Sequence, residues 1–260
     1  MSDSGGYVWL VGAGPGDPDL ITLRGHKALH SADVVLYDAL VNPELLTGVQ
    51  AQRIYVGKRS GRHSLPQEEI CDLLVRLARA GKRVVRLKGG DPTVLGRGGE
   101  EGIRLGREGL PFEIVPGISS SIAAAASAGI PVTHRGVAEA FTVLTAHRRK
   151  EQGEFAIPAY CPKTTLVLLM GVATTPIWQA QLLDQGYPED LPVAFVTQGC
   201  GPDQRVVTTS VGNAQKSVES QGIEAPSIAI IGKVVELRPL LAWHATDVDI
   251  NQPALLSSAG

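Results

Sequence analysis

Two glycine-rich segments are the parts of this 260-residue sequence whose residue types and spacing could do chemistry. The first reads GAGPGD over residues 12–17, and the second reads KGGDP over residues 88–92. Each follows a short apolar run that we predict to be a strand, and ligands of open α/β sheets gather at the carboxyl ends of strands. Glycines let the backbone approach a ligand closely, while Asp17 and Asp91 add a carboxylate to each segment. The pair indicates a site for a cationic, zwitterionic or hydroxyl-rich small molecule rather than for a phosphate.

The first segment has the context of a dinucleotide-binding loop, because it lies between a predicted strand and a predicted helix. Its details differ from that fingerprint. Pro15 lacks a backbone N–H, and Asp17 places a negative charge where a pyrophosphate would bind. Asp38, which ends the next predicted strand, could substitute for the ribose-binding acid but comes late in the chain. An NAD-linked oxidoreductase, a non-catalytic nucleotide-binding module and a purely structural turn stay open as alternatives at this point.

The elements that must position these loops alternate between strands and helices. In the first part of the chain we expect strands at 7–11, 34–37, 83–87 and 112–115, helices at 20–31 and 98–107, and a further helix between Ser64 and Gly81. Ser64 and Gln67 read as a capping box for the second helix, with Pro66 in its first turn and Gly81 after its end. The alternation predicts a mostly parallel sheet with helices on both of its faces.

A second set of elements follows a boundary that we place near Pro116. We expect strands at 141–145, 165–170, 193–197, 206–209 and 227–232, and a helix at 174–185. The short connection between the third and fourth of these strands predicts a hairpin, so this sheet should be mixed. The sequence therefore predicts an α/β protein with an N-terminal domain over 1–115, a C-terminal domain over 116–245 and a flexible tail over 246–260.

Composition excludes several classes of function. The chain has 24 Lys and Arg against 26 Asp and Glu, so it lacks the basic excess of a nucleic-acid-binding protein. Cys71, Cys161 and Cys200 form no C-x-x-C motif, which argues against a zinc site or a redox pair and fits a reducing cytoplasm. The N-terminus does not resemble a signal peptide, and no run of about 18 apolar residues indicates a membrane span. We expect a cytoplasmic protein that binds neither nucleic acid nor membrane.

Several long motifs occur in one order along residues 7–243. They read VGAGPGDPDLITLRG, YDALV, GKRSGRHSLPQEEI, VVRLKGGDPTVLGRGGEE and VPGISSSIAAAASAGIPVTHRG, followed by LLMG, PVAFVTQG and SIAIIGKVV. With these motifs the sequence resembles the tetrapyrrole C-methyltransferases, and within them the members that act on uroporphyrinogen III. Diphthamide-pathway methyltransferases and enzymes that methylate other tetrapyrroles are the alternatives.

The resemblance implies an enzyme that methylates uroporphyrinogen III at C2 and C7 to give precorrin-2. The methyl donor would be S-adenosyl-L-methionine, which leaves as S-adenosyl-L-homocysteine, and no metal would take part. The family architecture implies two α/β domains with the cofactor in the cleft between them, and a homodimer. Since six residues precede the first predicted strand, we expect methylation without NAD-dependent ring oxidation or iron insertion.

The resemblance also assigns residues to the cofactor. The glycines would let the backbone reach it, Asp91 could hold its cationic part and Met170 offers a soft apolar wall, although Met170 could also only fill the core. The positions that match the family's cofactor-binding residues are Pro15, Gly89, Gly90, Asp91, Val94, Ser119, Ser120, Met170 and Gly199.

In this family the acid of the YD motif is the proton acceptor and the lysine of the GKR motif is the proton donor. These residues are Asp38 and Lys58 here, and Arg97 is a rival for a part in proton transfer. A carboxylate within hydrogen-bond reach can accept the proton that leaves the methylated pyrrole carbon. The alternatives are that Asp38 only caps an element and that Lys58 is only a solvated charge.

Uroporphyrinogen III carries eight carboxylates, so a chain of net charge −2 must gather positive charge locally. Guanidinium groups bind carboxylates through two parallel hydrogen bonds, whereas an isolated exposed pair contributes only about 0–1 kcal/mol. Several basic side chains are therefore needed together. The substrate-binding candidates are Arg59, Arg62, Arg97, Glu100, His134 and Arg135.

Overall fold

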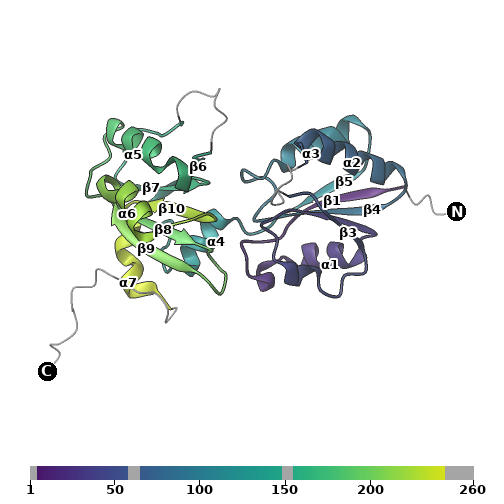
Figure 1. Cartoon of the computed structure of the whole chain (residues 1–260), viewed down its shortest axis with the longest axis horizontal. Coiled ribbons are helices and arrows are strands. Elements are labelled where there is room, and N and C mark those ends of the chain that lie inside the picture. The colour runs from purple at the N-terminus through teal and green to yellow at the C-terminus, as the bar shows by residue number, and fades with distance from the viewer. Residues whose placement is uncertain (1–4, 58–64, 148–154, 244–260) are drawn as a thin grey trace. The chain divides into compact units, whose positions relative to one another are not determined.

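The structure is a computed structural model that describes residues 5–57, 65–147 and 155–243 (Figure 1). The chain divides into two compact units, residues 1–120 and 121–260, and each contains one five-stranded sheet. Of the predicted features, Lys58, Arg59, Arg62 and the tail over 246–260 lie outside the described residues. The α/β class predicted from the sequence is confirmed.

The sheet of the first unit is parallel throughout, with strand order β3-β2-β4-β1-β5. Its strands are β1 (Tyr7–Gly12), β2 (Val34–Tyr37), β3 (Gln52–Tyr55), β4 (Arg83–Lys88) and β5 (Phe112–Val115). The central strand β4 is buried on both faces, and besides Val84, Val85 and Leu87 it buries the charged side chains of Arg86 and Lys88. Because all five strands run in one direction, the segments that follow β1, β2, β4 and β5 leave the sheet at the same edge.

Helices cover both faces of this parallel sheet (Figure 1). Helix α1 (Leu23–Ser31) contributes Ala28 and Leu29 to the core on one face. Helices α2 (Gln67–Arg79) and α3 (Gly98–Arg107) cover the other face, where Leu74 and Leu105 are fully buried. Since side chains alternate along a strand, every second residue of β4 points toward α2 and α3.

The sheet of the second unit is mixed, in the order β6-β7-β10-β8-β9, as the sequence predicts. Its strands are β6 (Ala140–Thr145), β7 (Thr164–Leu169), β8 (Pro192–Thr197), β9 (Arg205–Ser210) and β10 (Ser227–Ile231). Strands β6 and β7 are parallel, whereas β8 and β9 form the predicted antiparallel hairpin. The helices are α4 (Ser120–Ser127), α5 (Thr175–Asp184), α6 (Ala214–Gln221) and α7 (Arg238–Leu241).

Short 3-10 helices connect these elements. They are η1 (Pro18–Leu20), η2 (Pro43–Leu46), η3 (Val172–Thr174), η4 (Val211–Asn213) and η5 (Lys233–Leu237). No helix in the described part of the chain has the length and apolar character needed to cross a membrane. The same residues contain no group of three or more metal-ligating side chains.

Several features differ from the sequence prediction, which also does not include helices α4 and α7. Strand β3 was not predicted, because its sequence QRIY has only two apolar residues and lies at an edge of the sheet. Helix α6 was missed since its sequence AQKSVESQ has no apolar stripe, and only Ala214 is buried in it. Helix α2 begins at Gln67 with Pro66 as its N-cap and no side-chain cap hydrogen bond, so Pro66 precedes the first turn instead of lying in it. Ser64, the other member of the predicted capping box, lies outside the described residues.

Candidate active site

The two glycine-rich segments predicted from the sequence are joined to each other at the edge of the parallel sheet. The Gly90 N–H donates to the Gly14 carbonyl oxygen at 2.7 Å, and the Gly14 N–H donates to the Gly90 carbonyl at 3.2 Å. The Ala13 N–H donates to the Lys88 carbonyl at 2.7 Å. Gly14 and Gly90 have φ values of 81° and 67°, a left-handed conformation that glycine adopts without strain. The backbones of both segments are therefore held side by side.

The segments after β5 and β2 pack against this pair. A Cβ atom on Gly117 would lie 2.3 Å from the Gly90 carbonyl oxygen, and one on Gly12 would lie 2.5 Å from the Gly117 Cα. A Cβ atom on Gly89 would lie 2.6 Å from the Cβ of Leu40, which follows β2. These separations are too short for any side chain at the glycines, so the segments after β1, β4 and β5 converge through glycine backbones, and Leu40 after β2 packs on Gly89.

The Asp91 side chain forms hydrogen bonds with two of these segments, the one after β4 and the one after β5. One of its carboxylate oxygens accepts hydrogen bonds from the Thr93 N–H at 2.7 Å and the Thr93 hydroxyl at 2.6 Å. The other oxygen accepts from the Gly117 N–H at 3.0 Å. Burial of this side chain acts to raise the pKa of Asp91, but the hydrogen bonds from Thr93, Gly117 and Val94 outweigh it and lower the pKa. Asp91 is consequently ionised at neutral pH and links the segment after β4 to the segment after β5.

The first glycine-rich segment ends in Asp17, which caps the 3-10 helix η1. Asp17 is the N-cap of η1, and its side chain accepts a hydrogen bond from the Asp19 N–H at 2.9 Å. Pro15 precedes this turn and supplies no backbone donor. The loop therefore offers neither the third glycine nor the helix N-terminus that a pyrophosphate needs.

Arg97 lies at the start of α3 in an unusual backbone conformation. It is the N-cap residue of that helix and has a φ of 61°. Its guanidinium forms two hydrogen bonds of 2.8 Å with the Glu100 carboxylate. The hydrogen bond to Glu100 raises the pKa of Arg97 above its ordinary value. Arg97 is therefore a permanent cation, half exposed beside the glycine-rich segments, which suits the binding of an anion better than the acceptance of a proton.

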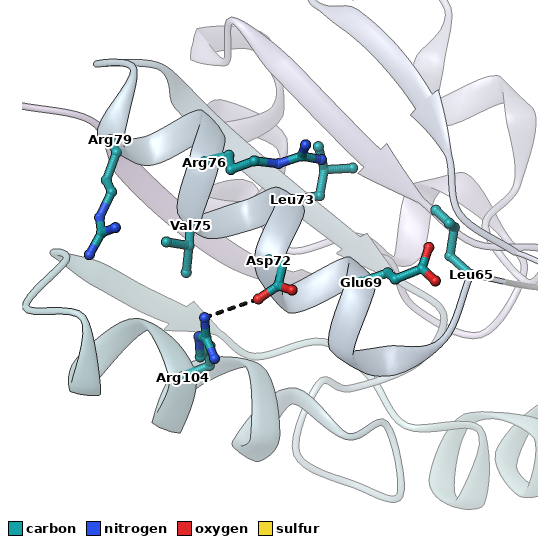
Figure 2. A pocket seen from close by; sticks show the side chains of 8 residues that line it. All are labelled: Leu65, Glu69, Asp72, Leu73, Val75, Arg76, Arg79 and Arg104. Atoms are coloured by element: carbon teal, nitrogen blue, oxygen red, sulfur yellow. Dashed lines mark ion pairs between the residues drawn. The ribbon is translucent and has the colours of Figure 1, made fainter.

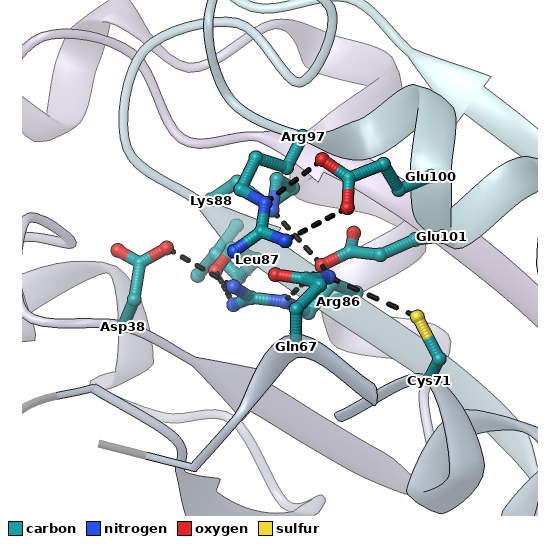
Figure 3. Close-up of polar contacts among 9 residues, drawn as sticks. All are labelled: Asp38, Gln67, Cys71, Arg86, Leu87, Lys88, Arg97, Glu100 and Glu101. Carbon is teal, nitrogen blue, oxygen red and sulfur yellow. Dashed lines mark hydrogen bonds and ion pairs between the residues drawn. The ribbon is translucent and has the colours of Figure 1, made fainter. Parts of the chain in front are cut away.

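Asp38 lies at the end of β2 and is the outer member of a cluster of charged side chains (Figure 3). One carboxylate oxygen accepts from Arg86 Nη2 at 3.3 Å, and the other accepts from the Leu40 N–H at 3.3 Å. Arg86 Nε donates in turn to Glu101 Oε1 at 3.2 Å, and Lys88 Nζ donates to the same oxygen at 3.0 Å. The side chains of Arg86, Lys88 and Glu101 are at most 4% exposed, whereas Asp38 is 26% exposed.

Helix α2 completes the cluster. Gln67 Nε2, at the first residue of α2, donates to Glu101 Oε1 at 3.0 Å and lies 3.8 Å from Cys71 Sγ (Figure 3). Burial lowers the pKa of Lys88, the neighbouring Arg86 lowers it further, and Glu101 opposes both effects. Burial raises the pKa of the Cys71 thiol, which keeps Cys71 an uncharged wall of the cluster.

Sequence reasoning missed Arg86, Lys88, Glu101 and Gln67. A signal for two of them is present in the run VVRLK, because Arg86 and Lys88 are two residues apart in an apolar strand and must share one face. A buried cation requires a partner, so this spacing by itself predicts a carboxylate on the covering helices. Which carboxylate would pair could not be read from the sequence.

Ser119 and Ser120 continue from the Pro116–Gly117 turn, and Ser119 is buried. The remaining predicted residues belong to the second unit. Met170 follows β7 with a φ of 60° and is 50% exposed. A Cβ atom on Gly199 would lie 2.4 Å from the Cβ of Ala124 in α4. The sequence-predicted residues that the first unit brings to one edge of its sheet are Pro15, Asp38, Gly89, Gly90, Asp91, Val94, Arg97, Glu100, Ser119 and Ser120.

His134 and Arg135 lie on an exposed turn of the second unit. The His134 N–H donates to the Ala138 carbonyl oxygen at 2.9 Å, and the His134 ring nitrogen lies 2.9 Å from the Arg135 carbonyl oxygen. Both side chains are exposed. This geometry is compatible with contact to a large anionic ligand.

A groove of about 590 Å³ lies elsewhere, on the outer side of α2 and α3 (Figure 2). Arg104 pairs there with Asp72 at 3.0 Å, and Arg79 pairs with Glu108. The groove contains none of the residues predicted for the site. Its lining residues are Leu65, Glu69, Asp72, Leu73, Val75, Arg76, Arg79 and Arg104.

Comparison with known proteins gives consistent matches. The family described as Tetrapyrrole (Corrin/Porphyrin) Methylases matches residues 7–215 of this chain. A siroheme synthase from Azotobacter vinelandii (strain DJ / ATCC BAA-1303) is 48% identical over 243 residues, which cover 92% of this chain and 52% of that protein. The chain thus spans about half the length of the curated relatives it matches.

Two solved structures are also similar. A crystal structure of uroporphyrin-III C-methyl transferase from Thermus thermophilus, complexed with S-adenyl homocysteine, is 39% identical with a TM-score of 0.76. That match covers 89% of this chain and 94% of the other. A cobalt precorrin-4 methyltransferase is 31% identical with a TM-score of 0.74, covering 88% of this chain and 95% of the other.

Proposed function

This chain belongs to the tetrapyrrole methylase family, and from that premise we propose that it methylates uroporphyrinogen III at C2 and C7 to give precorrin-2. The methyl donor is S-adenosyl-L-methionine, and S-adenosyl-L-homocysteine is the second product. The convergence of the segments after β1, β4 and β5 through glycine backbones, with Asp38 and Arg97 at the same edge, is the observation that carries the proposal. The relatives named siroheme synthase support sirohaem formation as the use of the product.

The residues present fit the cofactor. S-adenosylmethionine, when bound, supplies a methyl group on a sulfonium centre. A Cβ atom on Gly90 would meet no atom nearer than 3.8 Å, so a ligand can approach the backbone there, and ionised Asp91 follows it in the chain. Both carboxylate oxygens of Asp91 already accept hydrogen bonds from Thr93 and Gly117, so Asp91 acts by shaping the loop. The residues that would hold the cofactor are Pro15, Gly89, Gly90, Asp91, Val94, Ser119, Ser120, Met170 and Gly199.

The reaction needs a group that accepts a proton. When a pyrrole carbon forms its new bond to the methyl group, positive charge develops on the ring system and a proton must leave. Asp38 is a partly exposed carboxylate whose two oxygens are oriented by Arg86 and Leu40, so it is the proton acceptor of this proposal. Lys58, which lies outside the described residues, is the proposed proton donor.

The eight carboxylates of the substrate need cations at the surface. Arg97 supplies one, and Glu100 fixes its guanidinium while leaving part of it exposed. Arg59, Arg62, His134 and Arg135 are the further substrate-binding residues of this proposal. A bidentate guanidinium–carboxylate pair contributes orientation as well as affinity, which favours methylation at defined carbons.

Anaerobic incubation with uroporphyrinogen III and labelled S-adenosylmethionine tests the proposal. We expect a dimethylated product whose label maps to C2 and C7. Absence of that product beside an active control enzyme would refute it. A second candidate, methylation of a later corrin-type ring, is favoured by the similarity to cobalt precorrin-4 methyltransferase, and a competing corrin substrate in the same assay separates the two.

Two observations argue against the NAD-linked alternative that the sequence left open. Membership of a methylase family and the absence of phosphate-binding geometry after β1 argue against an NAD-linked oxidoreductase. A melting-temperature shift with S-adenosylhomocysteine and none with NAD is expected, because only a ligand that binds the folded state stabilises it. The homodimer, the cytoplasmic location and the absence of a metal remain part of the proposal.

A further inference from the structure

Glu101 is fully buried, and one of its carboxylate oxygens accepts three hydrogen bonds. Gln67 Nε2, Arg86 Nε and Lys88 Nζ all donate to Oε1, at 3.0, 3.2 and 3.0 Å (Figure 3). The other oxygen, Oε2, is buried and has no hydrogen-bond partner among the described residues. Burying a charge costs several kcal/mol before pairing, and an apolar cluster of similar volume is often as stable. Stability alone therefore does not account for a carboxylate at this position.

Arg86 connects Glu101 to the edge of the sheet. Its Nε atom donates to Glu101, its Nη1 atom donates to the Leu87 carbonyl oxygen at 3.0 Å, and its Nη2 atom reaches Asp38 at 3.3 Å. The planar guanidinium is thus held in three directions, and its orientation is determined. Asp38 is the exposed end of this chain of contacts, since Arg86 and Glu101 are almost completely buried.

We propose that Glu101 is a positioning residue for methyl transfer, which orients the Asp38 carboxylate through Arg86. This inference rests on the proposed function, in which Asp38 accepts the proton. A proton acceptor must lie within hydrogen-bond reach of the proton it removes, so a small rotation of its carboxylate slows the reaction. The hydrogen bond from Arg86 Nε to the buried Glu101 carboxylate fixes the orientation of the Arg86 guanidinium.

Lys88 explains why the charge of Glu101 matters as well as its shape. Arg86 and Lys88 are two buried cations on neighbouring positions of one face of β4, and Glu101 pairs with both. Without that negative charge the two cations repel each other, and Asp38 is the remaining carboxylate that pairs with Arg86. The Arg86 guanidinium is then held only by the Leu87 carbonyl and Asp38 itself, so it no longer fixes the orientation of the Asp38 carboxylate.

The substitution Glu101→Gln removes the negative charge of this side chain and keeps its shape. The amide oxygen can take the place of Oε1 and the amide nitrogen can take the place of Oε2, where no partner is displaced. Glu108→Gln is the matched control, because Glu108 follows the same helix and pairs at the surface with Arg79 and Arg104. We expect Glu101→Gln to slow single-turnover methyl transfer at least tenfold, and Glu108→Gln to leave it within twofold.

A double-mutant cycle tests whether Glu101 acts through Asp38. In an Asp38→Asn background, Glu101→Gln should slow the remaining reaction by less than twofold, because the group that it orients no longer accepts the proton. The dissociation constant of S-adenosylhomocysteine should stay within twofold in each variant. An equal slowing in both backgrounds would overturn the positioning role, and so would a loss of cofactor affinity that accounts for the slowing.

Arg86→Lys keeps the experiment decisive if Glu101→Gln does not fold. A single ammonium cannot bond Glu101, the Leu87 carbonyl and Asp38 together, so the same non-additive pattern with Asp38→Asn is expected. Wild-type protein without any methyl transfer would refute the proposed function and this inference with it, whereas active protein with additive variants would refute the inference alone.

Hydrogen exchange of the Arg86 Nε–H, followed by nitrogen-15 NMR on the full chain without ligands, gives a readout that does not depend on activity. We expect slow exchange in the wild type and in Glu108→Gln, and at least tenfold faster exchange in Glu101→Gln. Unchanged exchange in Glu101→Gln would show that Glu101 does not anchor Arg86, and would overturn the inference.

Discussion

Removal of the Asp91 carboxylate should both destabilise the first unit and weaken cofactor binding. Asp91 is 9% exposed, and its carboxylate accepts hydrogen bonds from the Thr93 N–H, the Thr93 hydroxyl and the Gly117 N–H. A hydrogen bond to a charged group contributes about 1.5–3 kcal/mol, and donors freed at a partly open loop regain part of this from water. We therefore expect Asp91→Ala to lower the free energy of unfolding by about 2–4 kcal/mol in total.

Denaturant unfolding beside calorimetric titration with S-adenosylhomocysteine measures both effects. The dissociation constant should rise tenfold or more, which corresponds to about 1.4 kcal/mol of binding free energy. Thr93→Ala is the matched control, since it removes the Thr93 hydroxyl donor and leaves the carboxylate; its cost should be about 1 kcal/mol. A folded Asp91→Ala protein with unchanged unfolding free energy and unchanged affinity would refute the reasoning.

The same carboxylate predicts a pH dependence. The pKa of Asp91 is lowered in the folded state relative to the ordinary value of about 3.9, so folding favours the ionised form. Its contribution is fully present above that ordinary pKa and is lost as the pH falls through the lower folded-state pKa. The stability difference between the wild type and Asp91→Asn should therefore be constant from pH 7 to about 5 and shrink below about 4. A difference that grows on acidification would contradict the assignment.

Three further predictions concern the reaction and the loops. Arg97→Ala and Arg135→Ala should each lower kcat/KM for the tetrapyrrole about tenfold or more while cofactor affinity stays nearly intact, and two variants with wild-type kcat/KM would place the substrate cations elsewhere. Asp38→Asn should slow single-turnover methyl transfer by about 10²–10⁴ without a change in thermal stability, whereas a fast but less stable variant would identify Asp38 as a cap. Gly117→Ala should destabilise the protein by at least about 1–3 kcal/mol, because its Cβ would meet the Gly90 carbonyl oxygen; an unchanged unfolding free energy would show that the loop can yield.

Most of the elements could be predicted from the sequence because their signals are local. The strand at 34–37 and the helix at 98–107 agree with the structure at both ends, since their apolar patterns lie within the segments themselves. The hairpin of β8 and β9 follows from a short connection in the same way. Strand β3 and helix α6 could not be predicted, because their stability comes from neighbours in space rather than from their own apolar pattern.

The sequence by itself determined the two glycine-rich segments, the acids beside them and the resemblance to a methylase family, because all of these are encoded in short continuous motifs. Only the tertiary structure decided that the Asp91 carboxylate accepts its hydrogen bonds from Thr93 and Gly117. It also decided that Glu101 is the partner of Arg86 and Lys88, while the adjacent Glu100 pairs with Arg97. The physical reason is that adjacent residues of a helix point in different directions. Which carboxylate meets the buried cations of β4 therefore depends on how α3 packs on the sheet, and no local pattern contains that packing.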